Sequence, residues 1–132
     1  MVAYSFKRRF VGPIQSGSKC QTIRADRKRH AIQGEELQLY TGMRTKACEM
    51  IGRAACINVA PIRIDVENGR IELESGTALT TLAELDAFAR IDGFEEWGEM
   101  RRFWEENHPD IRVFSGVLIR WCDIALPATA AP

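Results

Sequence analysis

The residues best suited to chemistry lie close together near the N-terminus. Lys19, Thr22 and Arg24 bring an amine, a hydroxyl and a guanidinium group within six residues. A lysine that has lost its charge can act as a general base, and a neighbouring hydroxyl can then act as a nucleophile. An arginine binds anions such as phosphate or a developing oxyanion. These residue types indicate a site for a polar, nucleotide-like ligand, and they do not select one reaction.

Side-chain direction sets a condition on this site. In a regular strand, residues 19 and 22 point to opposite faces, because successive side chains alternate. Lys19 must therefore precede the strand, in a turn, if its amine is to meet the hydroxyl of Thr22. Gly17 and Ser18 come directly before it, and such a pair favours a turn at this point.

The surrounding sequence predicts the elements that must position these groups. Residues 4–11 favour a strand, residues 13–17 allow one helical turn, and residues 21–24 favour a short strand. Further strands are predicted at residues 36–40, 50–64 with an interruption near Pro61, 70–73 and 113–122. Amphipathic spacing predicts helices at residues 82–90 and 95–107.

Two local signals mark element boundaries. Asn68-Gly69 is typical of a type I′ hairpin turn, and Thr81 with Glu84 forms the pattern of a helix capping box. Several strands joined by short turns, with two helices before the last strand, predict an α+β fold. A partly closed barrel would bury such strands and limit their open edges.

The length and composition suit one domain with one core. The chain has 132 residues, of which 45% are hydrophobic and 27% charged. We expect a single domain over residues 1–125 and a flexible tail over residues 126–132. No apolar run approaches the length of about 18 residues that a membrane helix needs, and no secretory signal is recognisable. We therefore expect a cytoplasmic protein with no membrane partner.

Cysteine and histidine spacing gives no support for a metal centre. The four cysteines are Cys20, Cys48, Cys56 and Cys122, and none belongs to a Cys-x-x-Cys pair. They are interpreted as reduced thiols. Neither His30 nor His108 completes a zinc-binding spacing with them. We expect neither a metal nor a cofactor.

The charge is unevenly placed although it sums to zero. Residues 1–46 carry ten Lys or Arg and three Asp or Glu, a net charge of +7, and residues 47–132 carry the opposite charge. Folding can either mix these charges or leave a basic face suited to phosphate. The zero total argues against a protein that coats nucleic acid by charge alone.

Four segments, taken in order, are similar to the ASCH domain of the PUA-like superfamily. These segments are residues 17–24 (GSKCQTIR), 34–37 (GEEL), 92–100 (DGFEEWGEM) and 114–119 (FSGVLI). The resemblance extends over nearly the whole chain, from about residue 4 to residue 121. It implies a PUA-like β-barrel of five to six mostly antiparallel strands, flanked by two to three helices, with a cleft near Lys19.

Within this family, the chain resembles the small bacterial N4-acetylcytidine amidohydrolases. These carry a Lys-x-x-Thr pair and a nearby arginine, which match Lys19, Thr22 and Arg24. Their later glutamate falls at or near Asp92, where this chain has the shorter acid, and Glu95 or Glu96 is the alternative. This chain is also longer, with an added hairpin around Asn68-Gly69.

The amide chemistry that the resemblance implies suggests a role for each candidate residue. Lys19 would act as the base, Thr22 as the nucleophile, and Asp92 would position Lys19 or deliver a proton to the leaving amine. Arg24 or a main-chain N–H would stabilise the oxyanion. The expected substrate-binding residues are Arg24, Tyr40, Phe6 and Glu95, with Tyr40 or Phe6 stacking on the base.

Three functions remain open at this stage. The first is hydrolysis of the N4 amide of an acylated cytosine nucleoside. The second is a non-catalytic module that binds single-stranded RNA. The third is weak ribonuclease activity, in which Lys19 acts as a general base on a 2′-hydroxyl. The sequence leaves open whether the chain is a monomer or a dimer.

Overall fold

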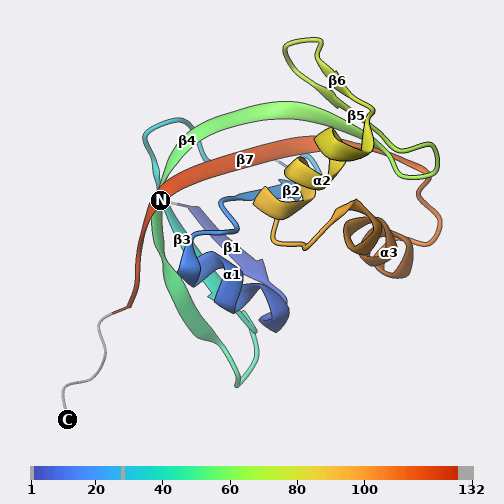
Figure 1. Ribbon diagram of the computed structural model, residues 1–132. Helices are drawn as coiled ribbons and strands as arrows, with labels where there is room; N and C mark the ends of the chain where they lie inside the picture. The colour runs from blue at the N-terminus through green and yellow to red at the C-terminus, as the bar shows by residue number, and fades with distance from the viewer. Residues whose placement is uncertain (1, 28, 128–132) are drawn as a thin grey trace.

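A mixed β-sheet forms the frame of the protein, and helices lie against it (Figure 1). The computed structural model describes residues 2–27 and 29–127, so residues 128–132 of the expected tail lie outside the described residues. The strands within this part are β1 (Val2–Phe6), β2 (Gln21–Arg24), β3 (Glu36–Thr41), β4 (Glu49–Asp65), β5 (Arg70–Leu73), β6 (Ala78–Leu79) and β7 (Val113–Ala125). The helices there are α1 (Val11–Ser16), α2 (Leu82–Ile91) and α3 (Trp97–Asn107).

Two long antiparallel strands form the centre of the sheet. β4 has 17 residues and β7 has 13, and they pair from Arg53 with Ala125 to Asp65 with Val113. The other edge of β4 pairs first with β3 and then with β5. Figure 1 shows β4 and β7 curving together across the molecule. Register shifts within this ladder accompany the bend, as β-bulges do in curved sheets.

The two end strands of the main sheet approach each other without pairing. β1 joins β3 in parallel, and β2 joins β7 in antiparallel orientation, which gives the order β1-β3-β4-β7-β2. Among the described residues, no ladder connects β1 to β2. A side chain bridges them, because Nη2 of Arg24 donates a hydrogen bond to the main-chain oxygen of Ser5 at 2.6 Å. The α+β class is confirmed. The described residues contain seven strands instead of five to six, and the curved sheet stays open between β1 and β2.

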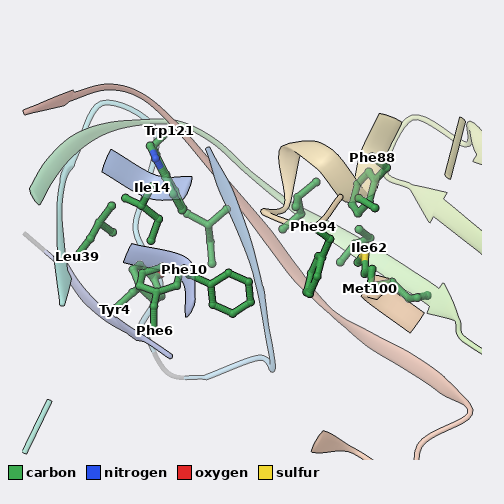
Figure 2. Packing of buried hydrophobic residues seen from close by; sticks show 14 of the residues in the cluster. Tyr4, Phe6, Phe10, Ile14, Leu39, Ile62, Phe88, Phe94, Met100 and Trp121 are labelled. Carbon is green, nitrogen blue, oxygen red and sulfur yellow. The ribbon is translucent and has the colours of Figure 1, made fainter. Parts of the chain in front are cut away.

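The hydrophobic core continues from the curved sheet to the two later helices (Figure 2). Figure 2 shows one group of side chains around α1, which includes Tyr4, Phe10 and Ile14, and a second group, which includes Phe88 of α2 and Met100 of α3. The Phe94 ring connects the two groups, because its centroid lies 5.5 Å from that of Phe10. The helices are therefore fixed to the sheet by aromatic packing.

Helix α2 begins and ends where the sequence indicated. The capping box between Thr81 and Glu84 is confirmed, with both reciprocal hydrogen bonds present. Helix α3 begins two residues later than predicted, after Glu96, whose carboxylate accepts the N–H groups of Gly98 and Glu99. Oδ1 of Asp86 on α2 accepts the N–H of Trp97 at 2.8 Å. This contact fixes the short turn between the helices.

The first predicted strand is shorter than expected. β1 ends at Phe6, and Arg8–Phe10 forms a 3₁₀ turn that continues into α1. The turn buries Phe10 in the core, which explains why alternation over residues 4–11 overestimated the strand.

The interruption predicted near Pro61 is wrong. β4 continues through Pro61, which pairs with Val117 of β7. On its other edge, β4 pairs with β3 only as far as Ala55 and with β5 only from Ile62. Proline lacks an N–H, and a strand tolerates it where one edge has no ladder partner.

The predicted hairpin is present, but its turn type is different. Gly69 has φ of 72°, whereas Asn68 is not among the described non-glycine residues with positive φ. A type I′ turn requires positive φ at both positions. The loop is closed by Asp65, whose main-chain oxygen accepts the N–H of Gly69 and whose carboxylate accepts the N–H of Asn68.

Gly116 permits the close approach of β7 to β2. A Cβ atom at this position would lie 2.4 Å from the main-chain oxygen of Arg24. We expect Gly116→Ala to lower the free energy of unfolding by about 2 kcal/mol or more, because neither strand can move without disturbing its ladder. Urea unfolding followed by tryptophan fluorescence measures this change.

Gly12→Ala is the matched control for this prediction. Gly12 lies within α1, and no heavy atom would lie within 4 Å of its added Cβ. We expect this change to leave stability unaltered or to raise it by up to about 1 kcal/mol. Equal losses in the two variants would contradict the role assigned to Gly116.

Candidate active site

The main chain holds Lys19 in a turn directly before β2. Helix α1 ends at Gly17, which adopts the left-handed conformation with φ of 86°. The N–H of Lys19 then donates to the oxygen of Pro13 at 2.9 Å, and the N–H of Cys20 donates to the oxygen of Ile91 at 3.1 Å. β2 starts only at Gln21. The geometric condition derived from strand alternation is therefore met.

The amine of Lys19 is buried at the end of α2. The residue is only 3% exposed, and Nζ donates a hydrogen bond to the main-chain oxygen of Asp92 at 2.5 Å. The nearer carboxylate oxygen of Asp92 lies 3.8 Å away. Nζ also lies 4.6 Å from the centroid of the Phe10 ring. A polar amine thus occupies a largely aromatic environment.

Gln21 holds the carboxylate that faces this amine. Asp92 is 5% exposed, and its Oδ1 accepts a hydrogen bond from Nε2 of Gln21 at 3.2 Å. Gln21 is itself fully buried, and its Oε1 has no partner within the described part of the chain. The sequence analysis missed Gln21. Its position next to Thr22 suggested the opposite face of the strand, and no other signal marked it.

Burial changes the proton affinities of the Lys19 and Asp92 pair in opposite directions. Loss of solvation lowers the pKa of Lys19, the Asp92 carboxylate partly opposes this shift, and the positive charge of Arg24 adds to it. Loss of solvation raises the pKa of Asp92, and Lys19 partly opposes that shift. These shifts favour the uncharged forms of both groups. An uncharged lysine is the form that can accept a proton.

Thr22 is held by Arg24. Its side chain is buried, and Oγ1 accepts a hydrogen bond from Nε of Arg24 at 3.0 Å. The guanidinium carbon of Arg24 lies 4.8 Å from the centroid of the Phe6 ring. Among the described residues, no direct hydrogen bond joins Thr22 to Lys19. Because a hydroxyl that accepts one bond can still donate another, Thr22 keeps its own proton for a second partner.

These side chains meet in one pocket of about 290 Å³. This volume lies near the lower end of the range of small-molecule sites, about 300–1,000 Å³. Its polar lining includes Lys19, Thr22, Arg24 and Asp92. Its apolar lining consists chiefly of Phe6, Phe10, Phe94, Phe103, Trp104 and Phe114. The pocket therefore combines a few convergent polar groups with aromatic walls.

The structure brings together most of the predicted site residues but not all of them. Lys19, Thr22, Asp92, Arg24 and Phe6 all line this pocket.

Tyr40 and Glu95 do not line it. The alternation of β3 buries Leu39 and Thr41 and turns Tyr40 to the other face, where its hydroxyl contacts Gln38. Glu95 is exposed in the turn before α3. Glu96, the other alternative to Asp92, uses its carboxylate to cap α3.

Apart from Phe6, the aromatic residues that line the pocket were not predicted to belong to the site. Phe103 and Trp104 belong to the helical stripe, and such a stripe most often indicates packing. The rings of Trp104 and Phe114 lie 4.8 Å apart, and those of Trp104 and His108 lie 4.9 Å apart. The helical spacing of the apolar residues identified the buried face of α3, but it could not show that part of this face lines a pocket.

Comparison with known proteins identifies the fold. Neither a family sequence model nor a curated protein sequence matches the chain. The crystal structure of ASCH from Zymomonas mobilis matches with a TM-score of 0.54 and 15% sequence identity. The alignment covers 92% of this chain and 66% of that one. This protein therefore has an α+β fold like that of the ASCH structure, in agreement with the resemblance found in the sequence. In the part of the chain described, no helix is long and apolar enough to cross a membrane.

Replacing Asp92 by Asn should make the free energy of unfolding depend on pH, because Lys19 stays buried. Asp92→Asn leaves Lys19 buried without a carboxylate, and we expect a loss of about 3 kcal/mol at pH 6. Lys19 must then lose its proton on folding, while the unfolded chain keeps it until pH approaches the ordinary lysine pKa of 10.5. Stability of the variant should therefore rise with pH by up to about 1.4 kcal/mol per unit. Urea unfolding between pH 6 and 9 measures this slope.

The wild-type pair provides the reference for this slope. Folded and unfolded wild-type chains each hold one proton on the pair across this range, so its contribution should be nearly flat. Glu95→Gln makes the same chemical change at an exposed position and should remain close to wild type. Parallel pH profiles for Asp92→Asn and wild type would show that Lys19 does not depend on this carboxylate.

Proposed function

We propose that the protein is an amidohydrolase that removes an acyl group from the exocyclic N4 amide of cytosine nucleosides, such as N4-acetylcytidine. One observation carries the proposal. A buried lysine whose pKa is lowered by burial and a buried threonine line the same pocket, with a carboxyl group beside the lysine. The Lys-x-x-Thr resemblance supports the choice of substrate, and the ASCH-like fold agrees with that resemblance.

The first half-reaction transfers the acyl group to Thr22. The neutral amine of Lys19 turns from the oxygen of Asp92 toward Thr22 and accepts the hydroxyl proton. Oγ1 of Thr22 forms a bond to the acyl carbonyl carbon as the carbonyl π bond opens to an oxyanion. Nε of Arg24 already donates to Oγ1, and this donation stabilises negative charge on that oxygen as the proton leaves.

The tetrahedral intermediate then collapses by breaking the bond between carbon and N4. The departing N4 receives a proton from the Lys19 ammonium, which supplies the neutral amine of cytidine as the leaving group. Asp92 holds Lys19 in place through its main-chain oxygen, and its own raised pKa makes it a second proton donor. Cytidine leaves, and an ester remains on Thr22.

Water completes the cycle. Lys19 accepts a proton from a water molecule, whose oxygen attacks the ester carbonyl of the acylated Thr22. The ester bond breaks, carboxylic acid is released, and Thr22 regains its proton from the Lys19 ammonium. Lys19 is thus base and acid in both halves of the cycle. The aromatic walls, Phe6 among them, offer flat surfaces against which the cytosine ring can stack.

Two substitutions test this mechanism. We expect Lys19→Ala and Thr22→Ala each to lower turnover of N4-acetylcytidine by about 10²–10⁴-fold or more, because each removes a group that takes part in proton transfer or bond formation. Conversion to cytidine can be followed by absorbance and acetate release by an enzymatic assay. Added methylamine should partly restore Lys19→Ala and should not restore Thr22→Ala.

The role proposed for Asp92 is tested by comparing two further variants. In the same assay, Asp92→Asn should weaken turnover more than Glu95→Gln, because only Asp92 lines the pocket. The reverse order would assign the acid to Glu95. Near-normal turnover in both alanine variants would disprove the Lys-Thr mechanism.

Binding of single-stranded RNA is the second candidate function. The observation that favours it is the group of rings at the pocket, Trp104, His108 and Phe114, of which His108 is exposed and Phe114 partly exposed. Such rings stack on bases of any sequence. The weak ribonuclease activity considered above would use the same site.

Salt distinguishes the two candidates. If the protein binds RNA through several phosphates, affinity for a short single-stranded RNA should fall steeply between 50 mM and 200 mM salt. Hydrolysis of an uncharged nucleoside should change little over the same range. A salt-independent affinity for RNA, measured by fluorescence anisotropy, would exclude an RNA-binding role through the phosphate backbone.

A further inference from the structure

Two cationic side chains without direct carboxylate partners in the described part of the chain line the pocket, and a third lies next to one of them. Lys7 and Arg24 line the pocket, and Arg27 lies against Tyr4 next to Arg24. Within residues 2–27 and 29–127, none of these three cations has a carboxylate oxygen within 4.0 Å of its side chain. Arg9 contrasts with them, because its guanidinium contacts Glu99 at 2.6 Å. None of these three cations is therefore paired directly with a carboxylate among the described residues.

Arg24 is the most informative of the three. It is half-buried, and its hydrogen bonds run to the neutral oxygens of Thr22 and Ser5. Burial lowers the pKa of Arg24 and the Tyr4 hydroxyl raises it, while the charge of Arg27 lowers it again and the more distant Asp92 carboxylate raises it. Withdrawing a guanidinium from water without an anion is costly. Its Nη1 group has no acceptor among the described residues and remains free to donate.

Arg27 is held close to Arg24 by the same aromatic ring. The guanidinium carbons of Arg24 and Arg27 lie 5.4 Å and 4.7 Å from the centroid of Tyr4. Nε of Arg27 donates to the main-chain oxygen of Arg29, which fixes its direction. The nearby carboxylate of Asp26 accepts a main-chain N–H and not a guanidinium hydrogen. Two like charges thus share one aromatic ring, and neither guanidinium is in direct contact with a carboxylate among the described residues.

We propose that Lys7, Arg24 and Arg27 form a phosphate-binding site, so that the ligand of the pocket is a phosphorylated cytosine nucleotide rather than the free nucleoside. A phosphate monoester carries between one and two negative charges at neutral pH and presents several acceptor oxygens, which matches guanidinium donors and an ammonium group. The identity of the base rests on the proposed function, but the phosphate site does not.

The position of Arg24 explains how one ligand would reach both parts of the site. Its Nε contacts the hydroxyl of Thr22, and its free Nη1 belongs to the same rigid, planar group. A nucleotide with its base among the aromatic walls and its phosphate near Lys7 would span this group. Binding of the phosphate would then orient the N4 side of the base toward Lys19 and Thr22.

Calorimetry with unreacted ligands tests the site without relying on catalysis. We expect wild-type protein to bind cytidine 5′-monophosphate about tenfold or more tightly than cytidine, because charge-assisted hydrogen bonds to phosphate are strong. Lys7→Ala and Arg27→Ala should each reduce this preference severalfold, and the double variant should abolish it. Lys46→Ala removes a charge from an exposed position outside the pocket lining and should keep the full preference.

The outcomes separate the phosphate site from the proposed function. Equal affinity for the two ligands in wild-type protein, or a preference that survives the double variant, would overturn the phosphate site even if N4-acetylcytidine is hydrolysed. A preference that disappears in the double variant supports the site. If N4-acetylcytidine and its 5′-monophosphate are both inert while that preference is seen, the amidohydrolase proposal fails and the phosphate site stands.

Discussion

The burial of the Lys19 amine against Asp92 is the interaction on which the candidate site depends. The two residues are 73 positions apart in the chain, so their contact requires the turn before β2 and the end of α2 to be held together. Main-chain bonds from the turn to Pro13 and Ile91 provide this. Because the surrounding rings exclude water, charge on either group is unfavourable. The fold thereby lowers the pKa of Lys19, which is the direction that the proposed reaction requires.

The open side of the sheet provides room for this pair. A ladder between β1 and β2 would satisfy their main-chain groups but would close the space that the pocket uses. Arg24 performs part of that role with its side chain, by bonding the oxygen of Ser5 across the opening. The same guanidinium holds the hydroxyl of Thr22. One residue therefore connects the integrity of the curved sheet to the orientation of the proposed nucleophile, and substitutions at Arg24 would affect both.

Local signals in the sequence predicted much of the fold, and tertiary context decided the rest. β2, β5 and α2 lie where their residue types and capping box indicated, and Lys19 precedes its strand as the geometry required. The interruption predicted at Pro61 was wrong because the edge of β4 that lacks a pairing partner there is set by the arrangement of the whole sheet, which the local sequence does not show. Gln21 and the rings that α3 contributes to the pocket were missed because alternation and helical periodicity predict which face of an element is buried, but not what that face contacts. Tyr40 was assigned to the site by residue type, and the alternation of β3 turns it away.

The pocket and the core share their walls, and this limits how the site can vary. Phe10, Phe94 and Phe103 contact one another at centroid distances of 5.3–5.5 Å and also line the pocket. A change that reshapes the pocket at these rings therefore also disturbs packing between α1, α3 and the sheet. The selectivity of the pocket for one ligand over another would then depend on its few polar groups and on the charges at its opening. Substitutions at those positions do not require the core to repack. The rings contribute in another way, because they remove solvent from Lys19 and so create the base that the proposed reaction needs.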